Sequence, residues 1–195
     1  MLNDAMLQTL QTLWEQGVQH DLQSGRQEQW HNITPDSGRF LYQMVRSSAA
    51  RRILEVGTSN GFSTLWLALA ARPLQGLVTS LDISAARQQH ALSNLQSVGV
   101  ESLVALRCAD AGIWLQELEA SPLDFLFLDA DRSRYLDWWT SIQRVLRPGG
   151  LVVMDNALSH AQECAPFMQQ VMATEGYLAQ TYPIGNGLFV ILKDE

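Results

Sequence analysis

Short runs of branched-chain residues alternate with helix-length segments from residue 52 onward, and this alternation limits the fold more than any other feature of the sequence. Five runs have this character: ILEV, LVTSL, LVALR, DFLFL and LVVM. Helix-length segments such as 85–97 and 133–146 separate them. Strands that alternate with helices favour right-handed crossovers and a mostly parallel sheet with helices on both faces. The pattern therefore predicts an α/β protein.

The two ends of the chain depart from this alternation. Near the C-terminus, the runs YLAQTYPI and LFVILK are separated only by GNG, which predicts an antiparallel hairpin. At the other end, the first thirty residues place apolar side chains on one face of a predicted amphipathic helix. These side chains are Met6, Leu10, Leu13, Trp14 and Val18. We expect one domain over residues 1–195, with residues 1–32 as a helical extension that packs on it.

Charge and segment composition limit the partners. The 195 residues hold 13 Lys and Arg against 20 Asp and Glu, a net charge of −7 that would repel nucleic-acid phosphates. No run approaches the length of apolar sequence that a membrane span needs, and the N-terminus lacks the pattern of a secretory signal. The two cysteines have no metal-binding spacing. We expect a cytoplasmic protein that binds neither nucleic acid nor membrane.

Acidic residues follow each of the five predicted strands. In open α/β sheets, ligands bind beyond the carboxyl ends of the strands. The residues at these ends are Glu55, Asp82, Asp110, Asp129 and the pair Asp155 and Asn156. Each of them alone would also fit a helix cap, because strand-to-helix loops favour Asp and Asn. Together they predict a polar binding rim at one edge of the sheet.

The loop GTSNG after the first strand indicates what binds there. A dinucleotide fingerprint needs G-x-G-x-x-G, whereas this loop offers only Gly57 and Gly61 and no lysine of a phosphate-binding loop. A nucleoside without phosphates fits better. Asp82, at the end of the second strand, could accept hydrogen bonds from both hydroxyls of a ribose, since a carboxylate has two acceptor oxygens.

Several segments resemble one enzyme family. LEVGTSNGFSTLWLA, DFLFLDADRSRY, LRPGGLVVMDN and PIGNGLFVILK, together with NITPDSGRFL, are similar to the cation-dependent O-methyltransferases related to the catechol and caffeoyl-coenzyme-A enzymes. The likeness covers residues 33–193. It implies S-adenosylmethionine as cofactor and the Rossmann-like class I methyltransferase fold. That fold has a mostly parallel seven-stranded sheet, an antiparallel C-terminal strand and helices on both faces.

The resemblance also implies roles for individual residues. Those implied to bind the cofactor are Ile33, Glu55, Gly57, Thr58, Ser59, Gly61, Ser63, Asp82, Ile83, Ala109, Asp110 and Asp129. Those implied to coordinate a divalent cation are Asp129, Asp155 and Asn156. Two carboxylates and a carboxamide oxygen are hard ligands suited to Mg²⁺, Mn²⁺ or Ca²⁺. The alternative for Asp155 and Asn156 is a helix cap.

Arg132 stands where the family has a lysine that accepts a proton. A guanidinium stays protonated at ordinary pH, so Arg132 can stabilise an anion but cannot serve as a general base. His160 in DNALSH is the nearest candidate base, because imidazole suits proton transfer near neutral pH. The alternative for His160 is an ordinary surface residue.

These features predict an O-methyltransferase that uses S-adenosylmethionine and a divalent cation to methylate a small, catechol-like hydroxylated acceptor. Only about twenty-five residues separate Asn156 from the hairpin, so we expect an open acceptor site or one completed by another subunit, as in a homodimer. Three alternatives remain at this stage. They are a non-catalytic cofactor-binding module, a protein-directed methyltransferase and, with less support, a nucleotide-dependent oxidoreductase.

Overall fold

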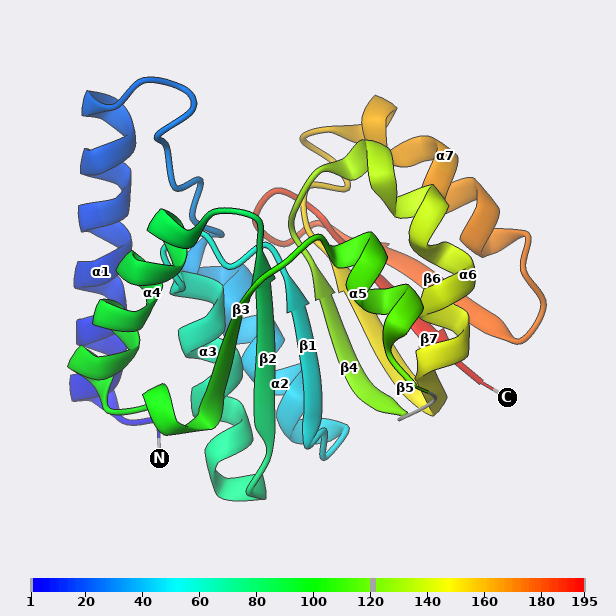
Figure 1. Ribbon diagram of the computed structural model, residues 1–195, viewed down its shortest axis with the longest axis horizontal. Helices are drawn as coiled ribbons and strands as arrows, with labels where there is room; N and C mark the ends of the chain where they lie inside the picture. The colour runs from blue at the N-terminus through cyan, green and yellow to red at the C-terminus, as the bar shows by residue number, and fades with distance from the viewer. Residues whose placement is uncertain (1, 120–121, 195) are drawn as a thin grey trace.

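A computed structural model describes residues 2–119 and 122–194. Its centre is a seven-stranded sheet with the order β3-β2-β1-β4-β5-β7-β6 (Figure 1). The strands are β1 Arg52–Val56, β2 Leu77–Asp82, β3 Val104–Cys108, β4 Leu123–Leu128, β5 Leu146–Met154, β6 Tyr177–Tyr182 and β7 Leu188–Lys193. Strands β1 to β5 pair in parallel, whereas β7 runs antiparallel to both β5 and β6. This topology confirms the predicted fold class.

Helices cover both faces of the sheet (Figure 1). One face packs against α5 (Ala111–Glu117), α6 (Tyr135–Val145) and α7 (Ala161–Met172). The other packs against α2 (Pro35–Ser47), α3 (Phe62–Ala71) and α4 (Ala85–Val98), with α1 (Asp4–Gln23) outside α2 and α3. Among the described residues, no helix combines the length and apolar composition needed to cross a bilayer.

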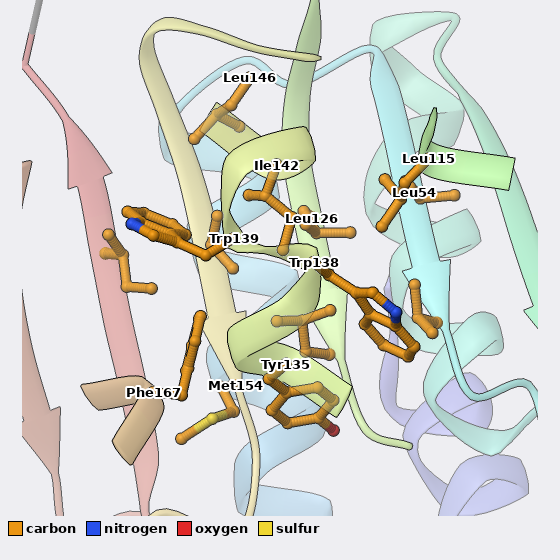
Figure 2. Packing of buried hydrophobic residues seen from close by; sticks show 14 of the residues in the cluster. Leu54, Leu115, Leu126, Tyr135, Trp138, Trp139, Ile142, Leu146, Met154 and Phe167 are labelled. Atoms are coloured by element: carbon orange, nitrogen blue, oxygen red, sulfur yellow. The ribbon is translucent and has the colours of Figure 1, made fainter. Parts of the chain in front are cut away.

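The core follows the two-residue period of the strands. Leu126 and Leu128 on β4 face the cluster under α5 to α7, and Phe125 and Phe127 face the opposite cluster. Apolar side chains therefore lie on both faces of β4, and this central strand packs against helices on both sides. Figure 2 shows how tryptophan and tyrosine side chains of α6 fill the first cluster beside β4 and β5.

Some boundaries differ from those expected. The second predicted helix begins at Tyr135 rather than 133, because a short 3-10 turn over Arg132–Arg134 precedes α6. Strand β5 begins at Leu146, five residues before the run LVVM. Arg147 accounts for this extension, since its Nε donates to Asp124 Oδ1 at 2.5 Å and ties the start of β5 to β4.

Candidate active site

A cavity of about 730 Å³ lies at the carboxyl ends of the parallel strands. These strand ends point toward the top of Figure 1. Most of the residues expected to bind the cofactor line it. They are Ile33, Gly57, Thr58, Ser59, Ser63, Asp82, Ile83, Ala109, Asp110 and Asp129. Arg132, Asn156 and His160 line it as well. The fold therefore gathers residues from five strand ends around one space, whereas Glu55, Gly61 and Asp155 are not on its wall.

The glycine loop brings β1 close to the end of β4. Gly57 has φ +105°, and a Cβ there would lie only 2.0 Å from the Asp129 carbonyl oxygen. Glycine is therefore required for both conformation and space. The amides of Gly57 and Thr58 donate to the Leu81 carbonyl and hold the loop against β2. The loop then enters α3, whose N-cap is Gly61.

Asp82 is a rigidly held carboxylate at the end of β2. Its Oδ2 accepts the Ser59 amide hydrogen at 2.9 Å, and its Oδ1 accepts that of Ser84 at 2.8 Å. Each oxygen has a second lone pair, so both can still accept from a ligand. The side chain is thus pre-oriented on the cavity wall, as a diol-binding group needs to be.

Glu55 lies behind the loop and is fully buried. Ser63 donates to its Oε1 at 2.6 Å, while Thr64 and Ser80 each donate to its Oε2 at 2.5 Å. Burial raises the pKa of Glu55 to about 7, against the lowering effect of these three donors. Direct contact with a ligand, as expected from the resemblance, has no support in this geometry. Glu55 instead joins α3 to β1 and β2 beneath the cavity.

Ile83, Ala109 and Asp110 line the side of the cavity near β3. Ile83 follows Asp82, is 81% exposed and lies on the cavity wall. Asp110 caps α5 by accepting the Ile113 amide hydrogen at 3.0 Å. Ala109 places its backbone beside the end of β2, since its amide donates to the Asp82 carbonyl. This side of the cavity therefore places an apolar side chain, a backbone segment and a carboxylate next to one another.

Asp129 and Asp155 end neighbouring strands. Leu128 on β4 pairs with Met154 on β5, so the two aspartates follow in matching positions. Burial and the nearby carboxylate of Asp155 raise the pKa of Asp129, and burial likewise raises that of Asp155. Asn156 has φ +68° and donates from Nδ2 to Asp129 Oδ1 at 3.1 Å.

The residues present fit a divalent cation. Asp155 is 2% exposed, and its Oδ1 is buried without a hydrogen-bond partner. A buried carboxylate oxygen without a partner is costly unless a cation or proton satisfies it. Within the described residues, no three His, Cys, Asp or Glu side chains gather to hold a metal, so a site here depends on Asn156 as the third ligand.

Arg132 is paired with an acid on α7 that no local sequence pattern indicates. Its Nε donates to Glu163 Oε2 on α7 at 2.9 Å, and its side chain is 22% exposed. The guanidinium also lowers the pKa of both Asp129 and Asp155, which shows that its charge acts on the two carboxylates. Arg132 therefore links α7 electrostatically to the strand ends.

His160 stands at the start of α7 and faces the cavity. Its Nδ1 lies 2.9 Å from Ser159 Oγ, and that hydroxyl donates to Asn156 Oδ1 at 3.2 Å. The imidazole is thus connected to the carboxamide through one serine. Its Nε2 takes no part in that chain.

The sequence matches a known protein family over most of its length. A sequence model described as O-methyltransferase matches residues 6–179, most of the chain. The protein belongs to the O-methyltransferase family. A catechol O-methyltransferase of Mycobacterium tuberculosis is 36% identical over 129 residues, 65% of this chain and 57% of that protein. A caffeoyl-CoA O-methyltransferase of Zea mays is 31% identical over 144 residues, 70% of this chain and 54% of that protein.

Solved structures resemble this family member over nearly its whole length, although the match covers less than two thirds of both curated relatives. A cofactor-bound protein from MTB has a TM-score of 0.82 and 27% identity, covering 96% of this chain and 90% of its own. An O-methyltransferase of Bacillus cereus, solved with SAH, has a TM-score of 0.79 and 24% identity, covering 99% and 93%. At 24% identity, the likeness to the Bacillus cereus protein supports the fold alone.

One wall of this O-methyltransferase family member was not anticipated from the sequence. Residues 24–32 follow α1, and Trp30 and His31 in this segment line the cavity. Both backbone amides donate to Asp21, at 2.6 and 2.9 Å, and the Trp30 carbonyl accepts from Ser59 Oγ at 2.7 Å. These contacts join residues up to 29 positions apart. The only local signal was an aromatic residue within a polar stretch next to Ile33.

Proposed function

We propose that this protein transfers a methyl group from S-adenosylmethionine to a hydroxyl oxygen of a small, catechol-like acceptor. One observation carries the proposal: the Gly57 loop, Asp82 and the strand-end residues Asp129 and Asn156 all line the same cavity. In this proposal a nucleoside site and an oxygen-rich cation site lie next to each other. Family membership removes the support for a nucleotide-dependent oxidoreductase.

In this proposal the side of the sheet formed by β1, β2 and β3 binds the cofactor. S-adenosylmethionine supplies an electrophilic sulfonium methyl group. The carboxylate of Asp82 accepts the ribose hydroxyls, which charge-assisted hydrogen bonds favour. Ile83 covers one face of the adenine, and Asp110 with Ala109 forms its edge. Ile33, Thr58, Ser59 and Ser63 enclose the methionine end, while Gly57 and Gly61 shape the loop.

The proposed cation ligands are Asp129, Asp155 and Asn156. A divalent cation bound there lowers the pKa of a hydroxyl that it contacts, and so supplies acceptor activation. The carboxylates of Asp129 and Asp155 provide the negative charge that holds it, and the unpartnered Oδ1 of Asp155 gains a partner. When no cation is bound, the guanidinium of Arg132 offsets part of the negative charge of Asp129 and Asp155.

We propose His160 as the group that accepts the hydroxyl proton, because Arg132 cannot do so. Its imidazole lies on the cavity wall, and Ser159 orients the ring through Nδ1, which leaves Nε2 for the acceptor. Orientation of a base by a fixed partner is what proton transfer in a site requires. Arg132 acts as an electrostatic group rather than as a base.

Two measurements on the purified protein test the proposal. Calorimetry should show binding of S-adenosylhomocysteine and none of NAD. Mass spectrometry of reactions with S-adenosylmethionine, Mg²⁺ and a panel of catechols should then show products heavier by one methyl group. Cofactor binding without turnover on any diol would indicate a non-catalytic module or a protein-directed enzyme. Preferential binding of NAD would refute the proposal.

A further inference from the structure

Strand β6 forms one edge of the sheet, and its outer side has no partner strand. Within the part of the chain that the structure describes, its residues Tyr177–Tyr182 pair with β7 alone. Figure 1 shows β6 at the opposite side of the sheet from β3, which forms the other edge. An edge strand offers its unpaired N–H and C=O groups to any strand that can approach it.

The pairing with β7 shows which backbone groups of β6 point outward. The Asp194 amide donates to the Gly176 carbonyl at 2.8 Å, just before β6 begins. In an antiparallel pair, such bonded positions recur at every second residue. Because the register of β6 and β7 is unbroken, the even-numbered residues of β6 bond to β7. The backbone groups of Tyr177, Ala179 and Thr181 therefore point away from the sheet.

The side chains of β6 do not protect this edge. The strand contains no charged residue and no proline, two devices that keep edge strands from pairing. On one face of the strand, Leu178 is 69% exposed and Tyr182 is 40% exposed. The other edge strand, β3, carries the charged residue Arg107. Of the two edges, β6 is therefore the one open to another strand.

This edge is complementary to itself. Two copies of β6 can meet antiparallel about a twofold axis at Ala179, with Tyr177 of one copy opposite Thr181 of the other. In this register every outward N–H and C=O group of both strands has a partner. An axis one residue further along, at Gln180, would set Tyr177 opposite Pro183, which has no N–H to donate.

We propose that the outer edge of β6 binds a second copy of this chain, so that the two sheets become continuous through antiparallel β6 strands. On the exposed face, Leu178 of each copy lies opposite Gln180 of the other. The Gln180 side chain, which donates to the outward Thr181 carbonyl at 3.2 Å, gives up this bond to the second copy. The pairing requires no cofactor, cation or acceptor, so it stands apart from the proposed function.

The hairpin turn joins this surface to the cavity. Strand β6 leads into the GNG turn, where Asn186 lines the cavity and its carbonyl accepts the amide hydrogens of Leu158 and Ser159 at 3.1 and 3.0 Å. A Cβ on Gly187 would lie 2.6 Å from the Leu158 nitrogen, so the turn can approach this closely only with glycine there. A second copy that holds β6 therefore also steadies this part of the cavity wall.

Two measurements on the protein without added ligands test the pairing. Sedimentation equilibrium from micromolar to millimolar protein should show the mass rising from 21.8 kDa toward twice that value. Amide hydrogen exchange, followed by NMR, should slow about tenfold or more for Tyr177, Ala179 and Thr181 as the dimer forms. The even-numbered amides of β6 are bonded to β7 in both states and should change little.

Variants of exposed residues test the interface and its register. Leu178→Lys should weaken the dimer about tenfold, since it puts a charge on the edge and the twofold axis makes the change count twice. Leu77→Lys changes a leucine of similar exposure, 61%, on β2 and should dimerise as the wild type does. Adding Gln180→Glu to Leu178→Lys sets opposite charges across the interface and should restore most of the lost affinity.

A mass that stays at 21.8 kDa in millimolar protein would refute the pairing. A dimer in which the Ala179 and Thr181 amides exchange freely, or one that Leu178→Lys leaves intact, would also refute it, because the interface would then lie elsewhere. A double variant that stays as weak as Leu178→Lys would refute the axis at Ala179. None of these results depends on cofactor binding or methyl transfer, so the proposed function is tested separately.

Discussion

Arg132 donates to Glu163 across the gap between the 3-10 turn before α6 and the first turn of α7, at 2.9 Å. The pair fixes a permanent positive charge beside Asp129 and Asp155, at a position where a titrating amine would serve as a base. Such a charge would stabilise an anion near the proposed cation site but would move no proton.

Replacing Arg132 by lysine should maintain or raise turnover on simple catechols at alkaline pH, by up to about tenfold at pH 9, because a desolvated lysine can deprotonate. The rate is measured from pH 6 to pH 9.5 with Arg39→Lys as control, since Arg39 is half exposed, pairs with Asp36 at 2.9 Å and lies outside the cavity. A lysine variant without activity would mean that the guanidinium contacts an acidic group of the acceptor.

Asp82→Ala should weaken S-adenosylhomocysteine binding roughly ten- to a hundredfold, because about 1.5–3 kcal/mol of charge-assisted hydrogen bonding is lost. Calorimetry measures the change. Asp137→Ala removes an exposed carboxylate outside the cavity and should bind as the wild type does. Equal affinity of the Asp82 variant would exclude this residue from ribose recognition.

Divalent cations should raise the melting temperature of chelator-treated protein, since they bind the native state and relieve the repulsion between Asp129 and Asp155. Mg²⁺, Mn²⁺ and Ca²⁺ are compared by calorimetric scans. Asp155→Ala should abolish the response and leave cofactor binding intact. If none of the three ions moves the transition of the wild type, Asp155 and Asn156 are structural caps.

Glu55 should make the fold less stable as the pH rises. Its folded pKa of about 7 lies above the ordinary value of 4.5, so the folded state holds the proton longer than the unfolded chain. Its contribution is full below about pH 4.5 and is lost as the pH rises to about 7. The loss approaches about 3 kcal/mol, since one pKa unit corresponds to about 1.4 kcal/mol.

Urea unfolding of the wild type and Glu55→Gln at pH 5 and pH 8 measures this effect. Other titrating groups act on both proteins, so the difference between them isolates Glu55. The glutamine variant should gain relative stability at pH 8. A difference that is the same at both values would mean that Glu55 ionises normally inside the fold.

Much of the fold could be predicted because strand and helix periods are local. The five strand-end acids were found in the same way, since neighbouring parallel strands end at one edge. The face of the sheet toward which the Glu55 side chain points could also have been predicted from the sequence. Residues alternate along a strand, and Glu55 shares the face of Ile53, which packs toward α3 rather than into the cavity.

Other parts of the site could not be predicted because they depend on distant contacts. The segment around Trp30 is placed by Asp21 and by Ser59, from two elements that a local pattern does not connect. The pairing of Arg132 with Glu163 needs the α7 helix, whose first turn packs near the 3-10 turn. Long-range placement of polar side chains was therefore the main gap.

The contacts of the GNG turn have a consequence for handling this protein. The turn touches the 157–159 loop on one side and the cap of α2 on the other, where a Cβ on Gly185 would lie 2.5 Å from Thr34 Oγ1. A C-terminal fusion tag that strains β7 would pull on both. The 157–159 loop and the start of α2 would then be disturbed together, although more than 120 residues separate them in the sequence.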